Sequence, residues 1–145
     1  MQTELDSLTV NNTWSVVDRP APPTNVVDSR WVFALKRNVD GTINKFKARL
    51  VAKGFTQRHG LDYQDTYAPV VGWPALRLFL ALCAQMGLDA HQLDAVTAYL
   101  NGLIDFNIYM ELPSGPLRFT NKVALLNRSL YGLKQAGKLW NNDID

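Results

Sequence analysis

Asp94 is the side chain whose surroundings most need a chemical explanation. It lies in the run AHQLDAV, residues 90–96, which is short and apolar enough to be a buried strand. A buried carboxylate is normally paired with a cation, protonated or bound to a metal ion. No cation is near Asp94 in the sequence, so its partner would be a metal ion or a cation from elsewhere in the fold. The alternative is a half-exposed aspartate that caps a turn at residues 97–101, with Tyr99 as a packed core ring.

A run of cations in the segment KFKARLVAK is the second candidate feature. Side chains of an extended chain alternate between two faces, so one face here is cationic and the other is apolar. The cationic face carries Lys45, Lys47, Arg49 and Lys53. Like charges at alternate positions repel one another, and an anionic ligand across them would explain the pattern. The alternative is a sheet face that is open to water.

The formal net charge of +2 hides a strong separation of charge along the chain. Residues 30–60 hold eight cations against Asp40 alone, and residues 61–117 hold six anions against Arg77 alone. Such a distribution could hold a polyanion on one element and divalent cations on its neighbour.

Length and composition exclude several classes of protein. A chain of 145 residues, 47% of them hydrophobic, fits one globular domain. The single cysteine, Cys83, cannot form an internal disulfide, and two histidines do not complete a structural zinc site. The polar N-terminus has no signal-peptide pattern, and the apolar run at residues 75–84 is interrupted by Arg77. We therefore expect an intracellular protein of the cytoplasm or nucleus that is not secreted and has no membrane partner.

Local patterns predict the elements that must position these residues. The Asp40-Gly41 turn between two extended runs predicts a β-hairpin over residues 30–36 and 43–53. Pro74 and Gly87 delimit a helix over residues 74–86, whose wide apolar stripe predicts a core helix with Cys83 as a buried packing thiol. Residues 14–17 are predicted to be a short extended lead-in. Further strands are predicted at residues 90–96, 108–112 and 123–126, with a turn at 113–116 and a last helix at 133–142.

Four long segments follow one another in the chain: NNTWSVV, SRWVFALKRNVDGTINKFKARLVAKGFTQRHGLDYQDTYAPVV, LDAHQLDAVTAYLNGLIDFNIYMELPSG and SLYGLKQAGKLW. Together they closely resemble the reverse transcriptase of copia-type LTR retrotransposons, from about residue 12 to residue 140. The resemblance implies an α+β fold of the right-hand polymerase type. It makes residues 1–145 a single, truncated reverse transcriptase domain, with a fingers hairpin and following loop at about 30–70 and a partial palm at about 74–145.

The resemblance also assigns roles to the matching residues. Asp94 would bind both catalytic magnesium ions, and Tyr99 would face the sugar and exclude ribonucleotides. In the fingers, Lys47 and Arg49 would meet the triphosphate of the incoming nucleotide. The remaining assignments are Lys45 and Lys53 near the template backbone, and Gly132, Lys134 and Gln135 against the templating base and the nucleotide.

The activity that the resemblance implies is that of a transposable-element nucleotidyltransferase, an RNA-directed DNA polymerase. It joins deoxynucleoside triphosphates to a DNA primer on an RNA template by two-metal phosphoryl transfer. The family takes its other metal-binding carboxylates from a downstream Tyr-x-Asp-Asp turn, which these 145 residues do not contain. Because one carboxylate binds magnesium weakly, we expect the chain alone to be inactive.

Two other interpretations remain open. The chain could be a non-catalytic nucleic-acid-binding remnant that uses the basic hairpin. It could also be marginally stable, with exposed palm strands around Leu93, Ile108 and Leu126 that favour self-association.

Overall fold

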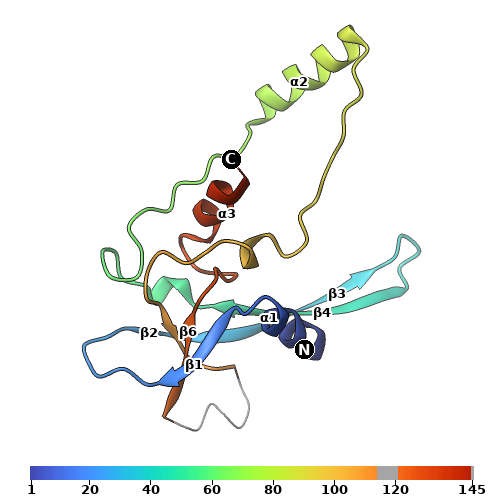
Figure 1. Ribbon diagram of the computed structural model, residues 1–145. Coiled ribbons are helices and arrows are strands. Elements are labelled where there is room, and N and C mark those ends of the chain that lie inside the picture. The colour runs from blue at the N-terminus through green and yellow to red at the C-terminus, as the bar shows by residue number, and fades with distance from the viewer. Residues whose placement is uncertain (114–120, 145) are drawn as a thin grey trace.

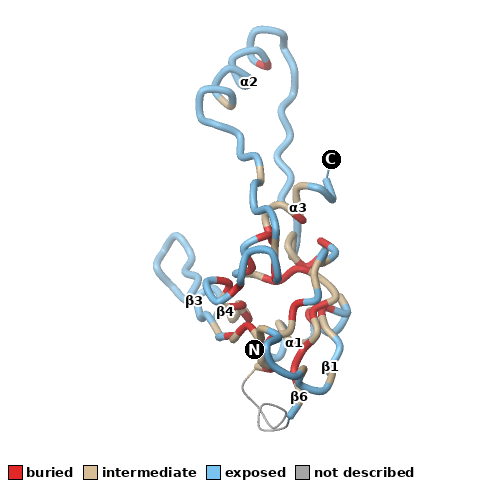
Figure 2. Tube along the Cα trace, turned by 90° about the vertical axis from the view of Figure 1, so that its left-hand side faces the viewer, coloured by how far each residue is buried: buried red, intermediate tan, exposed pale blue. Residues whose placement is uncertain are grey.

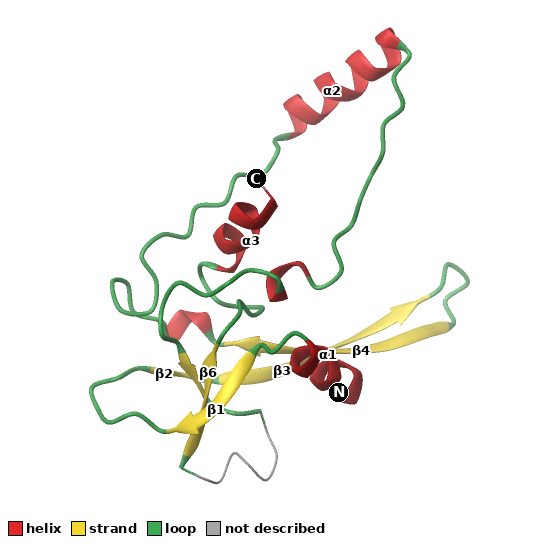
Figure 3. Ribbon diagram, viewed as in Figure 1, coloured by secondary structure: helices red, strands yellow, loops and turns green. Residues whose placement is uncertain are grey.

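The described part of the chain is a mixed α+β fold with two small sheets (Figures 1 and 3). A computed structural model describes residues 1–113 and 121–144. In chain order the first elements are α1 (Gln2–Val10), β1 (Trp14–Asp18), β2 (Val26–Val27), β3 (Ser29–Arg37), β4 (Ile43–Ala52) and the 3-10 turn η1 (Gly54–Thr56). They are followed by α2 (Trp73–Met86), the 3-10 turn η2 (Ala98–Leu100), β5 (Tyr109–Met110), β6 (Lys122–Leu126) and α3 (Ala136–Ile144).

The core lies around the four-stranded sheet, whose strand order is β1-β6-β5-β2. β6 pairs antiparallel with both β1 and β5, and β2 pairs parallel with β5. The most deeply buried apolar side chains include Val27, Leu50, Leu100, Ile108, Met110 and Leu130. The predicted strand at 123–126 is confirmed, whereas the one at 108–112 shortens to two residues. The extended lead-in at 14–17 is a paired strand, β1.

The predicted hairpin is confirmed as β3 and β4, which pair antiparallel with Trp31 opposite Leu50. Its turn is stabilised by Asp40, whose carboxylate accepts hydrogen bonds from the Thr42 amide at 2.9 Å and the Thr42 hydroxyl at 2.6 Å. These bonds lower the pKa of Asp40. Gly41, with φ of 85°, supplies the left-handed backbone that the turn needs.

The ends of α2 are as predicted, since Pro74 is in its first turn and Gly87 follows it with φ of 66°. Its predicted place in the core is wrong. Phe79 and Leu82 are 54% and 44% exposed, and Cys83 is the buried residue of the helix. Residues 65–72 and 88–95, which form no helix or strand, carry α2 away from the sheets (Figure 2). An apolar stripe shows that a helix surface is apolar, but not that another element covers it.

Three further predictions need correction. Residues 90–96 are not a strand, and Asp94 is exposed rather than buried, as is Leu93 at 93%. The expected exposed apolar face is also wrong at Ile108 and Leu126, which are 0% and 2% exposed in the core. A strand needs a hydrogen-bonding neighbour, and residues 90–95 have none among the described strands.

The chain termini differ from the predictions in smaller ways. The last helix begins and ends later than expected, at Ala136 and Ile144. α1 was not predicted at all, because its polar sequence has almost no apolar periodicity. The predicted turn at 113–116 falls largely outside the described residues. In the part of the chain that is described, no helix has the length and apolar character that crossing a membrane requires.

Candidate functional site

Asp94 and the cations of β4 line one pocket of about 460 Å³, which we call the Asp94 pocket. Its lining residues come from four separate parts of the chain: Glu4 of α1, Lys47 and Arg49 of β4, residues 94–99, and Tyr131. An acidic side chain that is exposed and remote in sequence from the hairpin is thus placed beside the cationic face of the hairpin. The pocket is open to solvent, so it can admit a ligand without a change of fold.

A tight turn brings both Asp94 and Tyr99 to the pocket. Thr97 adopts a left-handed conformation, with φ of 54° and ψ of 38°, which is costly for a β-branched residue. η2 follows directly, and its last residue, Leu100, is fully buried and anchors the turn in the core. The alternative of Asp94 as a cap is not supported, because η2 begins at Ala98, its N-cap residue is Thr97, and no side chain forms a cap hydrogen bond there.

Two aromatic rings, Tyr99 and Tyr131, also line the pocket. Tyr99 and Tyr131 meet edge to face with ring centroids 5.5 Å apart, and Tyr99 also packs against the core. The Arg49 guanidinium carbon lies 5.3 Å from the centre of the Tyr131 ring, which is within the range of a cation–π contact. Arg49 therefore lies against an aromatic ring where it lines the pocket.

Burial raises the pKa of the Tyr131 phenol above its ordinary value of 10.0, the nearby Arg49 charge opposes this rise, and Glu4 adds to it. Because the pKa of Tyr131 is higher in the folded than in the unfolded chain, the neutral phenol stabilises the fold. That stabilisation is complete below pH 10.0 and is lost as the pH rises through the folded pKa. We expect an ultraviolet titration to show one tyrosine that ionises late, and Tyr131→Phe to remove that component. A titration unchanged by Tyr131→Phe would contradict the assignment.

The segment that carries Tyr131 also contains three predicted site residues, which lie outside the lining of the Asp94 pocket. Gly132 packs against the end of β4, where the Ala52 amide donates to the Tyr131 carbonyl at 2.8 Å. Lys134 donates to the Tyr63 hydroxyl at 3.1 Å. Gln135 is fully buried. In this arrangement the segment positions Tyr131.

The two cations assigned to the template backbone are also placed apart from the pocket. Lys45 is exposed on β4 and lines a smaller neighbouring pocket near Met1 and Glu4. Lys53 follows the end of β4, and its ammonium group forms an ion pair with Asp28 at 2.5 Å. The cationic face of the strand itself therefore consists of Lys45, Lys47 and Arg49.

The described residues do not by themselves fit a magnesium site. Magnesium favours several converging hard oxygen ligands, usually carboxylates together with substrate phosphates. Among residues 1–113 and 121–144, no group of three acidic, histidine or cysteine side chains could hold a metal ion. Asp94 and Glu4 are the carboxylates that line the pocket.

Sequence reasoning identified four lining residues of the pocket, Lys47, Arg49, Asp94 and Tyr99, and missed two that matter for its charge and shape. Tyr131 could have been found, since it precedes Gly132 in the motif LYGLKQAGK. Glu4 carried no local signal, because its place depends on how α1 packs against β4.

Comparison with known proteins identifies similar sequences along nearly the whole chain. The family model described as reverse transcriptase (RNA-dependent DNA polymerase) matches residues 11–145. The retrovirus-related Pol polyprotein from transposon RE2 of Arabidopsis thaliana is 39% identical over 145 residues, which is 97% of this chain and 10% of that protein. The corresponding polyprotein from transposon TNT 1-94 of Nicotiana tabacum is 42% identical over 147 residues, or 100% of this chain and 11% of that protein.

A shorter similarity extends to an uncharacterized mitochondrial protein of Arabidopsis thaliana, which is 44% identical over 86 residues, or 59% of this chain and 50% of that protein. The chain spans about a tenth of the length of the Pol polyproteins that it matches. No solved structure matches it.

Proposed function

This chain belongs to the reverse transcriptase (RNA-dependent DNA polymerase) family of copia-type transposons, and from that premise we propose that the Asp94 pocket binds the triphosphate of a nucleotide. Lys47 and Arg49 would hold the phosphate oxygens, and the Tyr99 ring would contact the sugar. Asp94 would lie at the edge of the site, where further carboxylates are needed before metal ions bind.

One observation carries this proposal: Lys47, Arg49, Asp94 and Tyr99 line a single pocket. These residues belong to two segments that are separated by more than forty positions and by the exposed helix α2. A pocket that is lined by cations and an aromatic ring is suited to a ligand that has an anionic end and a flat or ring-shaped end.

The wider architecture of the family extends this proposal. We assign about residues 30–70 to fingers and about 74–145 to part of a palm, which would meet an RNA template and a DNA primer inside the cell. Gly132, Lys134 and Gln135 would support the nucleotide site by positioning Tyr131. The exposed apolar side chains of α2 favour self-association of the isolated chain.

Binding of inorganic tripolyphosphate tests the pocket directly. We expect the Lys47→Ala/Arg49→Ala variant to lose about tenfold or more in affinity, since charge-assisted phosphate contacts are strong. Calorimetry at low salt is the measurement, and Arg77→Ala is a matched control because Arg77 is exposed on α2. Equal binding by the double variant and the control would rule out the proposed site.

We also expect no primer extension by the 145-residue chain with template, primer, nucleotides and magnesium. The physical reason is the shortage of metal-binding carboxylates among the described residues. A gel assay that showed extension by the purified chain, and its loss in Asp94→Asn, would contradict this expectation.

A second candidate function is sequence-independent binding of single-stranded nucleic acid by the hairpin. It is favoured by Lys36 and Lys45, which lie directly opposite each other on β3 and β4 although like charges in that position repel. Salt titration of RNA binding by a Lys36→Ala/Lys45→Ala variant separates the two sites. If this variant loses RNA binding but keeps its tripolyphosphate binding, then Lys36 and Lys45 form a nucleic-acid site separate from the Asp94 pocket.

A further inference from the structure

The N-terminal helix α1 contributes a carboxylate to the Asp94 pocket. Glu4 lies in the first turn of α1, is partly buried, and lines the pocket together with Lys47 and Arg49. It comes from a part of the chain that has no role in the proposed nucleotide site. Its presence there raises the question of what a negative charge does beside phosphate-binding cations.

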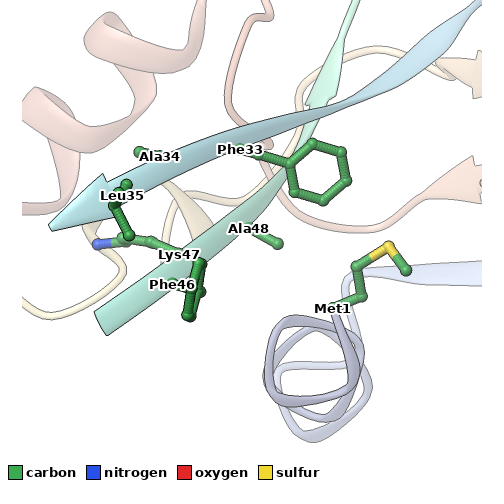
Figure 4. Close-up of a pocket in the computed structure, with 7 residues that line it drawn as sticks. All are labelled: Met1, Phe33, Ala34, Leu35, Phe46, Lys47 and Ala48. Carbon is green, nitrogen blue, oxygen red and sulfur yellow. The ribbon is translucent and has the colours of Figure 1, made fainter. Parts of the chain in front are cut away.

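Two observations place the start of α1 beside β4. The Leu50 amide donates to Glu4 Oε1 at 3.4 Å, which fixes the carboxylate at the edge of β4 that does not pair with β3. One turn earlier, Met1 lines an apolar pocket of about 460 Å³ with Phe33, Phe46 and Ala48, shown in Figure 4. Glu4 is thus held near the cations by the packing of its helix rather than by a direct ion pair.

The charges that line the Asp94 pocket balance. Lys47 and Arg49 supply two positive charges, and Glu4 and Asp94 supply two negative charges. A phosphate ligand would be attracted by the first pair and repelled by the second. Tyr131 responds to both kinds of charge, since Glu4 raises and Arg49 lowers the pKa of its phenol. Glu4 and Arg49 therefore act on the same small volume.

We propose that Glu4 is a specificity-determining residue that limits how much negative charge the pocket accepts. This inference rests on the proposed function, because it requires Lys47 and Arg49 to be the phosphate-binding residues. Repulsion from a fixed carboxylate grows with the charge of the ligand, so Glu4 weakens the binding of a bare tripolyphosphate more than that of a pyrophosphate. Loss of the charge at position 4 widens the range of anions that bind.

Glu4→Gln tests the proposal, with Asp6→Asn as the matched control. Asp6 lies on the same helix, is exposed, and accepts a hydrogen bond from Gln2 at 2.8 Å without lining the pocket. We expect Glu4→Gln to tighten tripolyphosphate binding about fivefold and pyrophosphate binding about twofold, by calorimetry at low salt with a chelator present. Asp6→Asn should change either affinity by less than about 1.5-fold, because exposed charges are screened.

Salt dependence separates an electrostatic role from a structural one. The difference between Glu4→Gln and the wild type should shrink as potassium chloride is added, whereas an effect of a displaced α1 would persist. Circular dichroism shows whether α1 is retained in the variant. The inference is overturned if Glu4→Gln binds like Asp6→Asn, or if its effect is the same for both anions or does not depend on salt. The proposed function itself fails only if Lys47→Ala/Arg49→Ala binds like the wild type.

Discussion

Replacing Gly132 with Ala should lower the free energy of unfolding by about 3 kcal/mol or more, because two costs add at this position. The backbone has φ of 89°, a region that residues with a Cβ rarely adopt. The added Cβ would also overlap the Ala52 carbonyl oxygen and lie 2.6 Å from Val51 Cγ1. Both neighbours belong to β4, so relief of the overlap must move the strand that carries Lys47 and Arg49.

Gly87→Ala is the matched control. Gly87 also has a positive φ, of 66°, but a Cβ built there meets nothing within 4 Å. Only the conformational cost remains, which we expect to be about 1 kcal/mol. Urea unfolding measures both variants, and equal losses of stability would show that the close approach of Gly132 to β4 is unimportant. Tripolyphosphate binding by Gly132→Ala should weaken as well, since Tyr131 and β4 are displaced together.

Replacing Gln135 with Ala should cost about 3 kcal/mol of stability, from unpaired buried polar groups and a cavity. Gln135 is fully buried, and both ends of its amide are bonded. Its oxygen accepts from Gln57 Nε2 at 3.0 Å, and its nitrogen donates to the Asp62 carbonyl at 2.8 Å. Gln57 Oε1 in turn accepts from the Lys134 amide at 2.8 Å, so the two glutamines join the segment after Tyr131 to residues 57–62.

A double-mutant cycle with Gln57→Ala tests this account. Because the two amides share a hydrogen bond, the double variant should lose less stability than the sum of the single losses. Gln85→Ala, on the exposed surface of α2, is the control and should change stability by less than about 0.5 kcal/mol. Strict additivity of the two buried substitutions would show that the amides do not act as a pair.

The elements that the sequence predicted well are those fixed by neighbouring residues. The hairpin follows from the Asp40-Gly41 turn and the extended runs beside it, and the ends of α2 follow from Pro74 and Gly87. The predictions that failed depend on distant partners. Residues 90–96 have the composition of a strand but no strand to pair with, and α2 has the stripe of a core helix but extends away from the sheets.

For the candidate site, too, the sequence predicted some features and not others. Lys47, Arg49, Asp94 and Tyr99 were singled out from pattern and resemblance, and the structure brings them to one pocket. Their environment was not predicted: Asp94 is exposed, Lys53 is paired with Asp28, and Gln135 is bonded within the core. Whether a polar group is free for a ligand depends on which distant groups satisfy it, and no local pattern contains that information.

The amino-acid order alone determined the family, the hairpin and the candidate residues of the site, because these depend on short-range spacing and on long contiguous motifs. Only the tertiary structure decided that Glu4 and Tyr131 complete the pocket and that two carboxylates and two cations line it together. The reason is physical: charge balance at a site is a sum over groups close in space, and α1, β4, η2 and the segment at Tyr131 become neighbours only when the chain folds.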